Sequence, residues 1–196
     1  MRFWQGLRKL FVYLLLALVL VTSGVYLNHR LALSREANDL SPIGNRVEVE
    51  GKQLNIYVTG SGSKTLVLLA GGGTTSPILD FKALTTQLES DYRIVIVERL
   101  GYGFSDDGDS PRDLETVNRQ TRQALEASGI QGPYVLVAHS MAGLEALYWA
   151  QEHPAEVSAI VGLDMAMPQS YDKVKVPTFV VKVGQMLLGL GYGRFL

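Results

Sequence analysis

Ser140 has the residue type and the neighbours of a catalytic nucleophile. It stands in the stretch Ala138-His139-Ser140-Met141-Ala142-Gly143, which follows an apolar run and opens a helical one. A serine on a sharp turn from strand to helix exposes its hydroxyl, and the residues two before and two after it must be small. Ala138 and Ala142 are small, but they depart from the G-x-S-x-G pattern, whose second glycine comes one position late, at Gly143. The alternative is that Ser140 is only a helix N-cap.

A glycine-rich loop, Gly71-Gly72-Gly73, follows another buried run and can supply backbone donors. A tetrahedral oxyanion needs two N–H groups about 3 Å away, and we expect those of Met141 and Gly72. The alternative is a flexible turn. Asp164, after the apolar run 157–163, is a candidate acid for a catalytic triad, with a structural role as the favoured alternative.

A general base is harder to find, and a hydroxyl is a poor nucleophile without one. The sequence has three histidines. His29 lies beside a long apolar run, His139 adjoins the serine, and His153 precedes Pro154. Neighbouring side chains on a sharp turn diverge, which excludes His139 as an easy partner. We expect His153 to end a helix.

Composition excludes several other kinds of site. The 196 residues include no cysteine, which excludes disulfides, thiolate zinc sites and cysteine nucleophiles. The net charge of -1 gives no basic footprint for nucleic acid. The stretch Gly60-Ser61-Gly62-Ser63-Lys64-Thr65 lacks the P-loop glycine before its lysine and precedes a strand, and Gly101-Tyr102-Gly103 lacks the third glycine of a dinucleotide motif. We expect no cofactor, no metal and no nucleic-acid partner.

The elements around these residues alternate between strands and helices. A hairpin is predicted from residues 46–50 and 54–58, with its turn at Gly51-Lys52. Continuous apolar runs predict buried strands at 66–70, 94–97, 134–138 and 157–163, and helical patterns occupy 77–89, 113–128 and 142–152. This alternation predicts an α/β fold, a mainly parallel sheet covered on both faces, with ligands at the carboxyl ends of its strands.

The loop after the strand at 94–97 reads Glu98-Arg99-Leu100-Gly101-Tyr102-Gly103-Phe104-Ser105. With the serine turn and the glycine loop, it gives three motifs in an order and spacing that resemble the α/β-hydrolase family, over residues 46–167. The resemblance implies that Ser140 attacks an ester, amide or thioester and forms an acyl-enzyme. It also implies structural roles for Glu98 and Ser105. The family places its catalytic histidine well downstream of the serine, where this sequence has none.

The same resemblance implies a sheet that is incomplete at the C-terminus. We expect a hydrolase core at 46–168 and, at 169–196, the truncated start of a cap or lid, so that the sequence is an amino-terminal portion of a hydrolase. Glycines within the apolar stretch 174–190 argue against a long regular helix there. Without further strands, the sheet would keep an exposed edge, which promotes aggregation.

An uncharged apolar run near the N-terminus predicts one transmembrane helix, at residues 10–27. It would reach about 27 Å, and Lys9 and Arg30 can place their charges at its ends. A basic cytoplasmic end precedes it at 1–9, and a connector follows at 28–45. We expect a single-pass protein with its globular domain outside the cytoplasm. The alternative is a signal peptide cleaved near Ala32-Leu33-Ser34.

Two classes of function remain open. One is a membrane-anchored serine hydrolase that is inactive or incomplete in this chain, because the catalytic histidine is missing. The other is a noncatalytic membrane-anchored binding domain or a degenerate hydrolase-like domain. The expected partners are a small-molecule or peptide acyl substrate and, through residues 10–27, the lipid bilayer.

Overall fold

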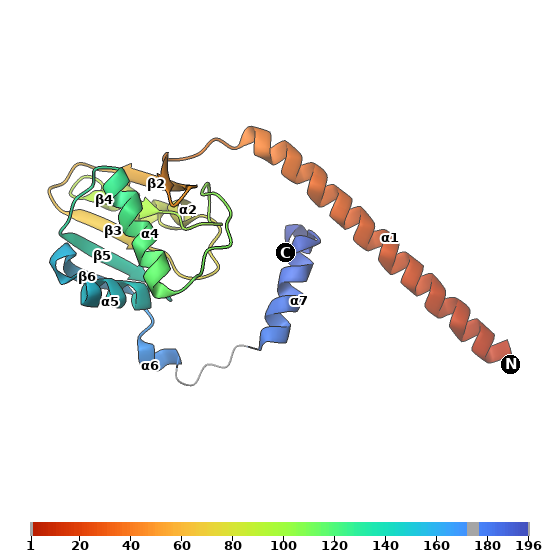
Figure 1. Ribbon diagram of the computed structural model, residues 1–196. Helices are drawn as coiled ribbons and strands as arrows, with labels where there is room; N and C mark the ends of the chain where they lie inside the picture. The colour runs from red at the N-terminus through yellow and green to blue at the C-terminus, as the bar shows by residue number, and fades with distance from the viewer. Residues whose placement is uncertain (1, 172–176, 196) are drawn as a thin grey trace. The chain divides into compact units, whose positions relative to one another are not determined.

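The chain divides into two compact units, residues 42–173 and residues 1–41 with 174–196 (Figure 1). The structure is a computed structural model and describes residues 2–171 and 177–195.

The unit of residues 42–173 is built on a sheet that has six strands in the described part of the chain, in the order β1-β2-β4-β3-β5-β6. The strands β3, β4, β5 and β6 are parallel, and β1 and β2 join antiparallel at one edge. The expectation of a mainly parallel sheet is thus confirmed. The strand bounds are β1 Asn45–Val49, β2 Lys52–Thr59, β3 Thr65–Leu69, β4 Arg93–Val97, β5 Tyr134–His139 and β6 Val157–Leu163.

The opening hairpin turns at Glu50-Gly51, one residue earlier than the sequence pattern predicts. Val49 pairs with Lys52, so only Glu50 and Gly51 lie between the strands. Both have positive φ, 54° and 75°. Two successive left-handed residues are typical of the tight turns that match strand twist, and glycine at the second position favours this one.

Helices cover both faces of the sheet. On one face α4 (Leu114–Ala127) and α5 (Ala142–Glu152) pack into a core cluster with β1, β2, β3, β4 and β5. On the other, α2 (Pro77–Asp80) and α3 (Lys82–Leu88) pack on β3, β4 and β5. Trp149 of α5 is fully buried, its ring meets Tyr134 edge-on, and its Nε1 donates to Glu156 at 2.9 Å. Glu156 belongs to a 3-10 turn, η1 (Pro154–Glu156).

The helix predicted at 77–89 is divided into α2 and α3 at Phe81. Phe81 has φ −88° and ψ 1°, which interrupts the helix, and its side chain is 7% exposed. The break allows the Phe81 ring to turn into the core. In an uninterrupted helix, the helical period alone would fix the direction of this side chain.

The strand β6 forms one edge of the described sheet, as the sequence led us to expect. Four of its seven residues pack against neither core cluster, and Val161 is 45% exposed. Beside it, next to α3, lies an apolar groove of about 290 Å³. Its lining residues are Lys64, Leu66, Leu84, Leu88, Tyr92, Val135, Val137, Val161 and Leu163. After β6 the chain forms a short helix, α6 (Pro168–Tyr171).

The other unit contains α1 (Arg2–Asp39), which is longer than the predicted span. Among the described helices, one is long and apolar enough to cross a membrane, by length and composition: Phe3–Ala37, within α1. The helix continues through residues 28–39, which were expected to form a connector. The sequence Leu31-Ala32-Leu33-Ser34-Arg35-Glu36-Ala37 explains this, because most of these residues are strong helix formers.

The same unit contains α7 (Thr178–Gly189) and the 3-10 turn η2 (Tyr192–Phe195). The glycine argument against a regular helix is wrong for this part of the tail, since α7 passes through Gly184 without a break. One helical glycine costs only about 1 kcal/mol. The tail meets α1 through Arg194, which pairs with Glu36 at 2.7 Å and donates to His29 at 2.8 Å. Residues 174–176 of the predicted apolar stretch lie outside the described residues.

Candidate active site

Ser140 occupies a strained backbone position between β5 and α5. Its φ is 51°, in the left-handed region that few residues other than glycine adopt. The Ser140 N–H donates to the Leu163 carbonyl at 3.3 Å, and its own carbonyl accepts from the N–H groups of Ala166 and Gly143, at 2.8 and 3.0 Å. The sharp turn from strand to helix that the sequence predicts at Ser140 is thus confirmed. The N-cap of α5 is Met141, so the N-cap alternative for Ser140 is wrong.

The small residues around the turn explain its departure from the G-x-S-x-G pattern. Ala138 and Ala142 are fully buried, so a methyl group fits at both positions. The position that excludes a side chain is Gly143, where a Cβ would lie 2.3 Å from the Ala166 carbonyl oxygen. The late glycine is thus required by the loop that follows β6.

The glycine loop lies directly against this turn. A Cβ placed on Gly71 would lie 2.9 Å from the Ser140 Cβ, and one on Gly72 would lie 2.8 Å from the Met141 Sδ. Gly72 and Met141 also line one cavity of about 470 Å³. The structure therefore brings the two predicted oxyanion residues together beside the half-buried serine. Met141 is the N-cap at the start of α5, where backbone N–H groups have no acceptor within the helix.

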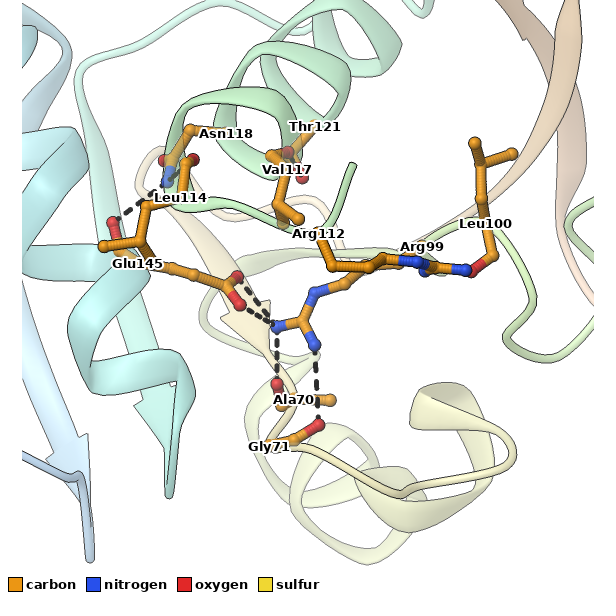
Figure 2. Close-up of polar contacts among 10 residues, drawn as sticks. All are labelled: Ala70, Gly71, Arg99, Leu100, Arg112, Leu114, Val117, Asn118, Thr121 and Glu145. Atoms are coloured by element: carbon orange, nitrogen blue, oxygen red, sulfur yellow. Dashed lines mark hydrogen bonds and ion pairs between the residues drawn. The ribbon is translucent and has the colours of Figure 1, made fainter. Parts of the chain in front are cut away.

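An ion pair that sequence reasoning missed lines the same cavity. Figure 2 shows Arg99, from the loop after β4, meeting Glu145 of α5 at 2.7 Å. The Arg99 guanidinium also donates to the Ala70 carbonyl at 2.6 Å and to the Gly71 carbonyl at 3.5 Å. The two charged side chains are only 15% and 12% exposed. Burial raises the pKa of Glu145, and the neighbouring Arg99 opposes that rise.

One signal in the sequence pointed to this pair. Glu145 is the only charged residue in the first nine positions of α5, Ala142 to Ala150, and it stands five residues after the serine. An isolated charge in an apolar helix needs a partner. The sequence does not show which of its many cations that partner is.

Glu98 has the structural role that the resemblance implies. Its carboxylate is fully buried and accepts from Asn55 Nδ2 at 3.0 Å, Ser76 Oγ at 3.0 Å and the Phe104 N–H at 2.8 Å. The hydroxyl of Ser105 donates to the Glu98 backbone carbonyl. These bonds fold the loop 98–105 back on itself and so fix the path of Arg99.

Asp164 lies at the carboxyl end of its strand, as Ser140 does, but it is exposed. It follows β6 with φ 47°, in the loop whose Leu163 and Ala166 bond to the Ser140 backbone. Its role as a triad acid stays a prediction.

The histidines offer Ser140 no placed base. His139 is exposed at the end of β5, and its ring meets Phe81 edge-on at 6.4 Å. His153 is the C-cap of α5, as expected, about 16 Å along the helix from its start. His29 belongs to the other unit. Within residues 2–171 and 177–195, no three or more His, Asp or Glu side chains form a cluster that could hold a metal.

Comparisons with known proteins identify the fold family of the chain. A family model described as "alpha/beta hydrolase fold" matches residues 64–186. An uncharacterized protein of Bacillus subtilis, YbdG, is 38% identical over 196 residues, which cover 98% of this chain and 60% of that protein. A 2-hydroxy-6-oxononadienedioate/2-hydroxy-6-oxononatrienedioate hydrolase of Paraburkholderia phymatum is 29% identical over 70% of this chain and 49% of its own length.

Solved structures share the fold. Cfl2 from Burkholderia cenocepacia superposes with a TM-score of 0.60 and 26% identity, over 68% of this chain and 45% of that one. The chain thus spans about half to three fifths of the length of these relatives.

Proposed function

We propose, because the chain belongs to the alpha/beta hydrolase family, that Ser140 is the nucleophile of a serine hydrolase that acts on an ester, amide or thioester. The observation that carries the proposal is the left-handed φ of Ser140, held by backbone bonds to the loop after β6. A strained non-glycine residue persists only where its surroundings fix it, and such positions gather at active sites.

In the proposed reaction, the Ser140 Oγ attacks the acyl carbonyl carbon and its proton passes to a base. The carbonyl oxygen gains a negative charge, which the N–H groups of Gly72 and Met141 stabilise. The tetrahedral intermediate then expels the protonated leaving group and leaves an acyl-enzyme. Water, deprotonated by the same base, releases the acid and restores the serine hydroxyl.

We further propose that the 196-residue chain alone is a poor catalyst, since no histidine is placed to act as that base. Oxyanion donors and binding can still leave roughly 10³-fold acceleration over water when triad members are lost. Asp164 remains a candidate acid of the proposed triad.

The apolar helix supports a membrane anchor as part of the proposal. Within Phe3–Ala37 the most apolar window has a mean hydropathy of 2.4. We propose that residues 10–27 cross the bilayer once and that the hydrolase unit faces the extracytoplasmic side, since Arg2, Arg8 and Lys9 precede the run.

Acylation by an activated ester tests the role of Ser140. The chain is incubated with p-nitrophenyl acetate, and acylated peptides are quantified by mass spectrometry over time. We expect Ser140 to be acylated faster than exposed serines, because the oxyanion donors lower its barrier, and we expect slow turnover. Ser140→Ala should lose this adduct, while Ser90→Ala, at an exposed serine of the same unit, should keep it.

Each outcome decides one part of the proposal. Acylation of Ser140 no faster than that of Ser90 would contradict the nucleophile and favour a noncatalytic binding domain. Turnover at ordinary enzyme rates that is abolished in Ser140→Ala would support Ser140 as the nucleophile. It would contradict the proposal that the chain has no base for this serine.

A further inference from the structure

We propose that Arg99 is a positioning residue that sets the direction of the Gly72 N–H, and that Glu145 holds Arg99 in place. This inference rests on the proposed function, in which the Gly72 N–H is an oxyanion donor. Nothing in the reaction itself requires Arg99, which would not touch the reacting atoms.

The loop that must present this donor has little stiffness of its own. Residues 71–73 are all glycine, and Gly73 has φ 80°. Glycine populates positive and negative φ about equally, so three in succession leave their peptide planes free to rotate. A donor that is useful in a transition state must already point the right way. Contacts from outside the loop therefore have to fix its peptide planes.

Arg99 makes those contacts, as Figure 2 shows. It donates to the Ala70 carbonyl at 2.6 Å and, more weakly, to the Gly71 carbonyl at 3.5 Å. A trans peptide is planar, and its C=O and N–H point in opposite directions. Because the Gly71 carbonyl shares a plane with the Gly72 N–H, a carbonyl drawn toward Arg99 turns that N–H away from Arg99. The same holds for the Ala70 carbonyl and the Gly71 N–H.

Glu145 explains why the arginine keeps this position. The ion pair at 2.7 Å anchors the guanidinium from α5, the helix that Ser140 and Met141 precede. One side chain thus ties the glycine loop to the helix that follows the serine turn. Asn118 of α4 donates to the Glu145 backbone carbonyl at 3.4 Å and so connects α5 to the next helix (Figure 2).

The chemistry of the side chain fits arginine and no other residue. Three separate acceptors surround the guanidinium: two backbone carbonyls and one carboxylate. A planar fork with five N–H groups can meet all three at once, whereas a lysine ammonium is a single point on a flexible stem. A buried ion pair is also weak evidence for stability, because apolar residues of similar size often serve as well. Its place beside the loop is what gives it a function.

Equilibrium binding of an alkylboronic acid tests the inference without requiring a catalytic base. The Ser140 Oγ adds to boron, the hydroxyl proton passes to solvent, and the anionic boronate places an oxygen between the oxyanion donors. We expect measurable binding by the full chain and loss of binding in Ser140→Ala. Arg99→Met should weaken binding about 10-fold or more, because a donor displaced by about 1 Å can cost that much. Arg99→Lys should recover part of the loss.

The matched control is Arg122→Met, which breaks another arginine–glutamate pair of the same unit, with Glu156. It should bind the boronate as the unchanged chain does. Glu145→Gln is the second variant, because Arg99→Met leaves a buried carboxylate without its partner and can prevent folding. Glu145→Gln keeps the shape of the side chain, removes the charge that anchors Arg99 and should weaken binding severalfold. Melting curves establish that each variant is folded.

Backbone order parameters of residues 71–73, from ¹⁵N relaxation, separate this inference from the proposed function. We expect lower order parameters there in Arg99→Met and Glu145→Gln than in Arg122→Met. If Ser140→Ala binds boronate as well as the unchanged chain, the proposed function fails, and the order parameters alone decide whether Arg99 holds the loop. Unchanged boronate binding in both variants, or unchanged order parameters at residues 71–73, would overturn the role of Arg99.

Discussion

Glu98 shows how a fully buried carboxylate can serve a site without touching it. Three donors, from Asn55, Ser76 and Phe104, surround its two oxygens. Their bonds compensate for the removal of the carboxylate from water, which is costly when no donor replaces it. The position of Glu98 is therefore fixed, and the loop that carries Arg99 begins at this residue. The Arg99 side chain can then reach the glycine loop from a defined direction.

Gly103→Ala tests how firmly the Glu98 carboxylate is held. Gly103 has φ 50°, and a Cβ there would lie 1.9 Å from Glu98 Oε2. We expect a loss of about 1–3 kcal/mol in the free energy of unfolding, measured by urea denaturation, because the buried carboxylate cannot move without losing its donors.

Gly51→Ala is the control for backbone strain alone. Gly51 has φ 75° in the hairpin turn, and nothing lies within 4 Å of a Cβ there. If both variants lose the same stability, the clash with Glu98 contributes nothing and the carboxylate is free to shift.

The helices α4 and α5 and the 3-10 turn η1 are joined at Glu156. Arg122 of α4 binds its carboxylate with two nitrogens, and Trp149 of α5 donates to it as well. The hydrogen bond from Arg122 is the main reason that the pKa of Glu156 is lowered. A group whose pKa is lowered by folding stabilises the fold above its ordinary pKa, and this contribution is lost as the pH falls through the lowered value.

Glu156→Gln should therefore destabilise the protein by about 1 kcal/mol near neutral pH, a modest value because the pair is about one third exposed. The difference from the unchanged chain should shrink as the pH is lowered from 6 to 3. Denaturation curves at several pH values measure it. Glu126→Gln, at an exposed glutamate of α4, removes the same charge and should show little effect. A difference that grows toward acid pH would mean that the ion pair does not lower the pKa.

The elements and the turn at Ser140 were predictable because local sequence specifies them. Runs such as Ile94 to Val97 are apolar throughout, which is typical of strands buried on both faces. Small residues around Ser140 indicated a close approach of backbone.

Other features depend on contacts distant in sequence. Arg99 and Glu145 are 46 positions apart, and only the packing of α5 against the sheet makes them partners. The break at Phe81 likewise follows from the burial of its ring, which outweighs local helix preference. The helix through Gly184 is a different case, because a single glycine costs a helix only about 1 kcal/mol.

For the behaviour of the full chain, the apolar surface of α1 gives the clearest expectation. Leu15 and Leu18 are 49% and 60% exposed, in the middle of the uncharged run. We expect the chain to remain with membranes after alkaline carbonate extraction. Replacing both leucines by arginine should release it, because each charge at the centre of a bilayer helix costs about 3 kcal/mol.

The same change at Leu31 and Leu33, beyond Arg30 on the same helix, is the control and should leave the chain in the membrane. Protease added to intact cells should digest the hydrolase unit if it faces outward. Protection from protease would contradict the proposed orientation. A soluble form that begins near Arg35 would favour the cleaved signal peptide.

The burial of Trp149 gives each unit its own optical reporter. The chain has two tryptophans, and the other, Trp4, is 72% exposed on α1. Trp149 is enclosed by the core and emits from apolar surroundings, so its fluorescence changes only when α5 separates from the sheet. Trp4→Phe would leave a single tryptophan, whose emission follows the unfolding of residues 42–173. Trp149→Phe would leave a tryptophan that responds to the lipid or detergent around α1.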